Sequence, residues 1–478
     1  MAKVELTTRR RNFIVAVMLI SAFVAILNQT LLNTALPSIM RELNINESTS
    51  QWLVTGFMLV NGVMIPLTAY LMDRIKTRPL YLAAMGTFLV GSIVAAMAPN
   101  FGVLMVARVI QAMGAGVLMP LMQFTLFTLF SKEHRGFAMG LAGLVIQFAP
   151  AIGPTVTGLI IDQASWRVPF IIIVGIALVA FIFGLISSYN EVKYTKLDKR
   201  SVMYSTIGFG LMLYAFSSAG DLGFTSPVVI GAMIISSIII YLFIRRQFNI
   251  SNALLNLSVF KNRTFALCTI SSMIIMMSMV GPALLIPLYV QNSLALSALL
   301  SGLVIMPGAI INGIMSVFTG KFYDKYGPRP LIYTGFTILT ITTIMLCFLH
   351  TDTSYTYLIV VYAIRMFSVS LLMMPINTTG INSLRNEEIS HGTAIMNFGR
   401  VMAGSLGTAL MVTLMSFGAK IFSSTSPSHL TATEIKQQSI AIGVDISFAF
   451  VAVLVMAAYV IALFIREPKV IESNRREF

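Results

Sequence analysis

Hydrophobic residues along the chain gather in long runs that short polar stretches separate. About 20 consecutive apolar residues are needed to cross the hydrocarbon core of a bilayer, and fourteen runs approach or exceed this length. They lie near residues 13–34, 51–71, 80–98, 102–129, 137–161, 168–188, 203–219, 227–244, 265–290, 299–319, 330–349, 355–379, 392–416 and 440–465. The pattern predicts an all-α polytopic membrane protein with fourteen transmembrane helices. A polar loop or short surface helix is expected over residues 417–440, which are rich in serine and threonine.

Composition and charge support this class. The 478 residues are 57% hydrophobic and 10% charged, which excludes a soluble globular protein. The net charge of +14 follows from topology, because 25 of the 32 lysines and arginines fall in loops on one side or in the C-terminal tail and four fall on the other side. The positive-inside rule then places both termini in the cytoplasm of a bacterial cell, with the protein in the plasma membrane. No nucleic-acid partner is predicted.

Chemistry-bearing residues are sparse. The two cysteines lie in separate apolar runs and the four histidines lie in or beside loops, so no disulfide framework or metal site is predicted. A polytopic membrane enzyme is one alternative, but it would need a nucleophile with a base or a carboxylate and histidine cluster. The chain offers no such set, and we expect no enzyme activity and no cofactor.

Two loops on the predicted cytoplasmic side share one order of residues. The loop after the second run contains Asp73, Arg74 and Arg78, and the loop after the tenth contains Gly320, Asp324, Lys325, Gly327 and Arg329. An arginine follows each acid inside an apolar run, Arg108 after 35 residues and Arg365 after 41. The repetition predicts two parallel six-helix halves, residues 1–200 and 263–478. Residues 201–262 would form an inserted hairpin of two helices with a linker.

The fifth run has one face of small residues. In a helix, Gly140, Gly143, Gln147, Ala151, Pro154 and Gly158 share this face. Small residues let membrane helices approach closely, and the proline is expected to bend the helix. The alternatives are a static packing groove and an interface that moves during transport.

Four motifs resemble those of the major facilitator superfamily. Residues 320–329 resemble its cytoplasmic loop motif, and the first copy departs from it at Ala69 and Lys76. Residues 104–116 resemble the motif whose arginine, here Arg108, is linked in that family to proton transfer, and Gln111 lies within it. Residues 149–158, with Gly153, Pro154 and Gly158, resemble the antiporter motif of exporters. Residues 27–37 resemble the first-span motif of the fourteen-span drug:proton antiporters, closest to the lincomycin-resistance type.

The resemblance implies a multidrug exporter that works by alternating access and proton antiport, with the proton gradient as its energy source. Its partners would be small-molecule drugs, protons and the lipid bilayer, and it would act as a monomer. A uniporter or importer of a small metabolite is the alternative within transport, and the antiporter motif argues against it.

One departure leaves the proton carrier open. The family's first-span acid is Asn28 here, and an amide cannot titrate. None of the eighteen acids falls at the middle of a predicted span; Asp445 lies about five residues inside the last run, and Asp221 is more exposed. We interpret Asp73 and Asp324 as gating partners of nearby bases and helix ends. Arg108 then needs backbone carbonyls, Gln111, Asn28 or water as partners, because an unpaired charge in hydrocarbon is unfavourable by about 2.5–3.5 kcal/mol.

A substrate cavity is predicted from residues that would face the centre of the bundle. Methionines suit promiscuous binding surfaces, although they also fill irregular core gaps. The candidates are Met273, Met276, Met277, Asn33, Gln147, Asn312, Asn377, Asn397 and Arg400. An apolar cavity with scattered amides favours bulky neutral or weakly basic amphiphiles.

Overall fold

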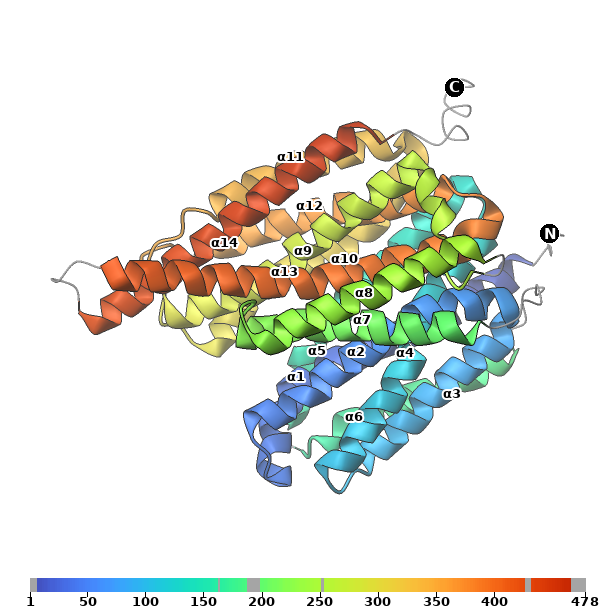
Figure 1. The fold of residues 1–478 in the computed structure, drawn as a ribbon, viewed down its shortest axis with the longest axis horizontal. Helices are drawn as coiled ribbons and strands as arrows, with labels where there is room; N and C mark the ends of the chain where they lie inside the picture. The colour runs from blue at the N-terminus through green and yellow to red at the C-terminus, as the bar shows by residue number, and fades with distance from the viewer. Residues whose placement is uncertain (1–6, 162–163, 187–197, 251–252, 426–430, 466–478) are drawn as a thin grey trace. The chain divides into compact units, whose positions relative to one another are not determined.

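The computed structural model describes residues 7–161, 164–186, 198–250, 253–425 and 431–465 (Figure 1). These residues form fourteen α-helices and three short 3-10 helices, and no strand occurs among them. The α-helices are α1 (Thr8–Leu43), α2 (Glu47–Arg74), α3 (Thr77–Ala96), α4 (Phe101–Leu129), α5 (Arg135–Ile161), α6 (Arg167–Ile186), α7 (Lys199–Leu222), α8 (Pro227–Asn249), α9 (Arg263–Asn292), α10 (Ala298–Tyr326), α11 (Pro328–Met345), α12 (Tyr355–Asn382), α13 (Ile389–Thr425) and α14 (Ala432–Leu463). Each predicted run coincides with one helix, so the all-helical prediction is confirmed.

Twelve of the described helices are long and apolar enough to cross a membrane. The set lacks α5 and α11, so the count of fourteen membrane spans stays a prediction.

Residues 417–440, expected to form a loop or a short surface helix, belong mostly to the two long helices, because α13 continues to Thr425 and α14 begins at Ala432. Close packing extends both helices: a Cβ added to Gly418 would lie 3.0 Å from Cα of Gly443. At the start of α14, Thr431 and Glu434 form a capping box. Their side chains accept hydrogen bonds from backbone N–H groups that have no partner within the helix, and this stabilises the helix start. Polar composition alone therefore misplaced the helix ends.

The chain divides into two compact units. The first unit comprises Met1–Gly210, Ile238–Ser258 and Arg385–Phe398, and the second comprises Leu211–Ser237, Val259–Leu384 and Gly399–Phe478. Helices α7, α8 and α13 contribute residues to both units. The sequence-based division at residues 200 and 262 rests on the repeated motifs, and it stays a prediction.

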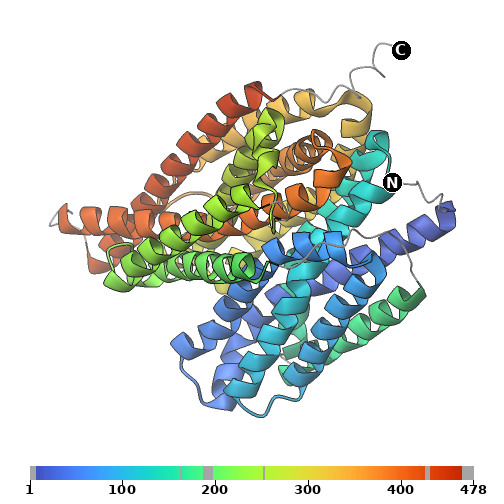
Figure 2. The same cartoon turned by 45° about the vertical axis from the view of Figure 1, so that its right-hand side comes forward.

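In the first unit, α1 packs on α4, α5 and α6, while α3 packs on α4 and α6 and α2 packs on α4 (Figure 1). The blue and cyan helices of this unit are seen from a second side in Figure 2. The second unit repeats the pattern, since α9 packs on α12 and α14, α11 packs on α12 and α14, and α10 packs on α12. Helix by helix, α9 takes the place of α1 and α12 that of α4, as an internal duplication predicts.

Glycines bring α3 and α4 together near the buried arginine of the first unit. A Cβ added to Gly91 would lie 2.6 Å from the backbone nitrogen of Gln111, and one added to Gly114 would lie 2.5 Å from the carbonyl oxygen of Ala84. No side chain fits at these two positions without moving backbone. This close approach holds the polar side chains of α4 within hydrogen-bonding distance of α3.

Candidate functional site

Arg108 is buried in the first unit, with none of its surface exposed. Its Nε donates a hydrogen bond to the carbonyl oxygen of Leu53 in α2 at 3.3 Å. Its Nη1 donates to Oε1 of Gln111 at 3.0 Å and to the carbonyl oxygen of Asn28 in α1 at 3.5 Å. The centroid of the Phe57 ring lies 4.1 Å from Cζ of the arginine, which gives a cation–π attraction. Three helices therefore hold this cation by backbone dipoles, an amide and an aromatic face.

Gln111 connects the arginine to the side chain of Asn28 in α1 and to one further helix, α3. Its Nε2 donates to Oδ1 of Asn28 at 3.4 Å and to Oγ of Ser92 in α3 at 3.0 Å. All three of these side chains are fully buried. The structure thus places Asn28 and Gln111 against Arg108, as their expected solvation of the guanidinium requires, and their part in transport stays a prediction. Ser92 was not predicted from the sequence; it shares its apolar run with two other hydroxyl-bearing residues, Tyr81 and Thr87.

No described carboxylate balances the charge of Arg108. The ion pairs formed by the described residues lie elsewhere in the chain. Nη2 of Arg108 and Nδ2 of Asn28 are buried, and neither has a hydrogen-bond partner in the part of the chain that the structure describes. Buried charges in proteins are normally paired, and a buried donor without a partner is unfavourable by about 1–3 kcal/mol. The cluster of Arg108, Gln111, Asn28 and Ser92 is therefore polar, positively charged and incompletely satisfied.

The second unit has a counterpart in Arg365 of α12, which is also fully buried. Its Nη2 donates to the carbonyl oxygen of Ser278 in α9 at 2.5 Å. Nε and Nη1 have no hydrogen-bond partner among the described residues. Because α9 corresponds to α1, both arginines donate to a backbone carbonyl on the first helix of their repeat.

Gly153 lies where α5 meets α1. A Cβ added there would overlap Oγ1 of Thr30 and lie 3.2 Å from Cβ of the same residue. Cδ1 of Leu27 would be 3.5 Å away. The structure thus shows the close approach that the small-residue pattern predicts at residue 153. Gly143 is half-buried in the same helix. Pro154 and Gly158 lie outside the residues whose side chains are described, and the bend expected at Pro154 stays a prediction.

Asp73, near the end of α2, contacts the first turn of α13. Ser390 Oγ donates to its Oδ1 at 2.7 Å, and His391 Nε2 lies 3.0 Å from its Oδ2. The backbone N–H of Asn256 donates to Nδ1 of His391 at 3.3 Å, so a neutral imidazole carries its proton on Nε2 and donates it to the carboxylate. Asp73 is therefore bound to a helix end, which is the kind of partner expected for a gating acid.

The other loop-motif residues have simpler surroundings. Arg74 donates a hydrogen bond to Tyr70, and Arg78 is exposed. In the second copy, Gly327 joins α10 to α11 with φ of +76°, a conformation that favours glycine. The remaining members are the buried Gly320, the half-buried Asp324, and the exposed Lys325 and Arg329.

The methionines predicted to line a cavity pack against glycines of α13 within the second unit. A Cβ added to Gly399 would lie 3.2 Å from Sδ of Met273, and one added to Gly407 would lie 2.9 Å from Cα of Met277. Met276 lies beside the same helix. The contacts are those of helix packing, and substrate binding by these residues stays a prediction.

The predicted cavity amides are mostly buried and bonded. Ser272 Oγ donates to Oδ1 of Asn377 at 3.2 Å, and Asn397 Nδ2 donates to Oε1 of Gln123 at 2.8 Å. Gln123, on α4, gave no motif signal in the sequence. Buried side chains also occur at Asn312, Gln147 and Arg400. The side chain of Asn33 lies outside the described residues.

Asp445 is a half-buried acid of α14. Its Oδ1 accepts a hydrogen bond from the backbone N–H of Leu349, in the turn after α11, at 2.9 Å. The contact holds the α11–α12 connection and involves no basic side chain. Asp221 lies in α7, and its side chain is outside the described residues.

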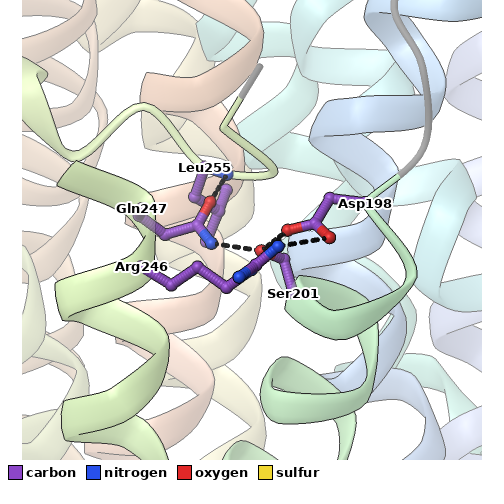
Figure 3. A network of polar contacts seen from close by, with 5 residues as sticks. All are labelled: Asp198, Ser201, Arg246, Gln247 and Leu255. Atoms are coloured by element: carbon purple, nitrogen blue, oxygen red, sulfur yellow. Dashed lines mark hydrogen bonds and ion pairs between the residues drawn. The ribbon is translucent and has the colours of Figure 1, made fainter. Parts of the chain in front are cut away.

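A polar network joins the ends of α7 and α8 that lie away from their connecting turn (Figure 3). Arg246 forms a two-point ion pair with Asp198, through Nε at 2.6 Å and Nη2 at 2.9 Å. Gln247 Nε2 donates to Oγ of Ser201 at 2.7 Å, and its Oε1 accepts from the backbone N–H of Leu255 at 3.2 Å. The hydrogen bond and charge of Arg246 lower the pKa of the Asp198 carboxyl to about 2. These contacts join α7 and α8 to each other and to the segment that follows α8.

The two helical units repeat one packing pattern, and each contains a buried arginine, as expected for a membrane transporter built by internal duplication. The chain belongs to the Major Facilitator Superfamily, whose family model matches residues 18–408. It is 41% identical to an uncharacterised transporter of this superfamily from Bacillus subtilis, YcnB, over 96% of each chain. It is 38% identical to the lincomycin resistance protein LmrB of Listeria monocytogenes, over 95% of this chain and 97% of that one. The structure matches the proton:xylose symporter XylE with a TM-score of 0.64 over 97% of each chain at 14% identity. Membership of the predicted superfamily is confirmed, and so is the predicted resemblance to the lincomycin resistance proteins.

Proposed function

We propose that this protein exports bulky amphiphilic drugs across the plasma membrane by alternating access and that proton antiport drives the export. The observation that carries the proposal is the 38% identity to a lincomycin resistance protein along nearly the whole of both chains. Fourteen spans with both termini in the cytoplasm are part of the proposal, and the distribution of basic residues supports them.

The buried cluster supports a transport role for Arg108. A guanidinium held mainly by carbonyl and amide dipoles can exchange these partners when helices move, since no strong ion pair fixes it. Gly153 supports an interface between α5 and α1 as well, because the absence of a side chain there leaves room for Thr30 and Leu27 of α1 to pack against α5.

Resistance profiling tests the proposed export. The protein is expressed in a bacterial host that lacks its major drug pumps, and inhibitory concentrations are measured for lincosamides and other amphiphilic drugs. Export predicts higher resistance than in the host with an empty vector, and a protonophore should abolish drug efflux from preloaded cells. Drug uptake in place of efflux would indicate an importer, and equal resistance with and without the protein would contradict the proposal.

The proton carrier is tested at Asp445. Asp445→Asn keeps an oxygen that can accept the Leu349 N–H, so the fold should survive while the titratable group is lost. Drug-induced proton release from everted vesicles is measured for this variant, for Asp221→Asn and for the parent. We expect Asp445→Asn to lose coupled proton release. An unchanged proton flux would remove Asp445 as the carrier.

A further inference from the structure

The Arg108 cluster contains more hydrogen-bond donors than acceptors, and its hydrogen bonds fix the direction of every amide. Arginine can only donate, so the Gln111 atom that it contacts must be Oε1. The Nε2 of Gln111 then faces Asn28, and the Asn28 atom that accepts from it must be Oδ1. This leaves Nδ2 of Asn28 as a donor with no acceptor, and rotating either amide would oppose two donors.

The two buried donors without partners belong to neighbouring side chains. Nη2 of Arg108 is one and Nδ2 of Asn28 is the other, and Arg108 also hydrogen-bonds the backbone of Asn28. The carbonyl, amide and hydroxyl groups around them carry no net charge. A neutral acceptor would satisfy the donors but would leave the charge of Arg108 uncompensated.

We propose that the Arg108–Asn28 pair binds a monovalent anion, either a small inorganic anion such as chloride or the carboxylate of a transported molecule. Such an ion accepts hydrogen bonds from both side chains and neutralises the guanidinium. A single cation with neutral neighbours balances one negative charge, and this excludes a polyanion. The site accounts for the surplus donors and the surplus charge together.

The chain provides an internal comparison at Arg365. The two nitrogens of Arg365 without partners, Nε and Nη1, both belong to the guanidinium. In the described part of the second unit, the residue that Arg365 hydrogen-bonds is Ser278, which has no side-chain amide. Among the described residues, an arginine nitrogen without a partner occurs beside a hydrogen-bonded residue whose amide nitrogen also lacks one at Arg108 and not at Arg365. Arg365→Gln is therefore the matched control for a buried arginine that lacks the second donor.

Because Arg108 has no exposed surface, the anion enters in a state that exposes it, and in this respect the inference rests on alternating access. Binding can nevertheless be measured without transport, since a ligand that binds the folded protein raises its unfolding midpoint. Failure of anion binding is thus distinguishable from failure of drug export.

The experiment uses the purified full-length protein in lipid nanodiscs. Sodium sulfate is replaced stepwise by sodium chloride in one series and by sodium acetate in another, at constant ionic strength, and the thermal unfolding midpoint is recorded. We expect a saturable rise in the parent protein and in Arg365→Gln. A rise with chloride alone identifies an inorganic anion site, and a rise with acetate alone identifies a carboxylate site.

Asn28→Asp is the decisive variant, because it replaces an amide with a carboxylate of the same shape beside Arg108. The built-in charge should make the midpoint insensitive to chloride and acetate, and Arg108→Gln should be insensitive for the opposite reason. The inference is overturned if the parent shows no dependence on either anion, or if Asn28→Asp keeps the parent's dependence.

Discussion

Gly153→Ala is the smallest change that tests the contact between α5 and α1. The new methyl group would overlap Oγ1 of Thr30 and lie 3.2 Å from its Cβ. Thr30 can turn its hydroxyl away, because threonine populates two rotamers in a helix. Its Cβ is fixed to the backbone of α1, and the helices must separate slightly to relieve that second contact.

The expected magnitude follows from two opposing effects. Overpacking a closely packed site destabilises by about 1–3 kcal/mol. Replacing glycine with alanine inside a helix stabilises by up to about 1 kcal/mol. We therefore expect Gly153→Ala to lower the free energy of unfolding by about 1–2 kcal/mol. Gly175→Ala, in α6 of the same unit, should be neutral or stabilising, because nothing lies within 4 Å of its added Cβ.

Thermal unfolding of the purified variants measures the effect, and efflux of a fluorescent drug from cells shows its consequence for transport. The penalty of Gly153→Ala should shrink in a Thr30→Ala background, which removes the hydroxyl that the methyl group would overlap. Equal midpoints for Gly153→Ala and Gly175→Ala, with no coupling to Thr30→Ala, would refute the close approach.

Three further predictions concern charged groups. Arg108→Ala should abolish efflux at an unchanged membrane level and Arg108→Lys should keep part of it, since lysine retains the charge but loses the planar fork; full resistance with Arg108→Ala would contradict this. Asp198→Asn removes the ion pair with Arg246. In the folded protein the pKa of Asp198 is about 2, which lies below its ordinary value near 4. The stabilisation from the ion pair is therefore present above about pH 4 and is lost as the pH falls towards 2. Unfolding midpoints of the parent and Asp198→Asn measured between pH 7 and 3 should therefore converge at the acid end. Asp73→Asn should lower thermal stability, because a neutral amide forms weaker hydrogen bonds with Ser390 and His391 than a carboxylate does. An unchanged midpoint would show that this contact contributes little.

The sequence predicts the helices well because a membrane imposes one rule on every span. Backbone groups in hydrocarbon must bond within the segment, so each long apolar run becomes a helix. The rule applies only within the hydrocarbon, and the misplaced helix ends over residues 417–440 belong to a polar segment to which it does not apply. There the Gly418–Gly443 approach and the Thr431 cap set the helix ends, and neither follows from hydropathy.

The buried site was predictable in part for a similar reason. Gln111 lies one turn after Arg108 on the same helix, so spacing alone brings the two side chains together. The carbonyl of Leu53 and the ring of Phe57 come from another helix, whose rotation about its axis is set by tertiary packing. The sequence places His391 in or beside a loop and gives it no role. Its contact with Asp73 depends on a pairing of distant segments that one sequence does not reveal.

The positions of the titratable groups narrow how a proton can act on this transporter. Asp445 accepts from the turn after α11, and Asp73 is bound to the start of α13; neither is a hydrogen-bond partner of Arg108 in the described structure. If protonation of either acid drives transport, it acts on the arginine through helix movement and not through direct transfer. Asn28→Asp changes this relation, because it places a titratable group directly against Arg108. If this variant gains proton-coupled export while losing its response to chloride, then the carboxylate at residue 28 has replaced a bound anion as the partner of Arg108.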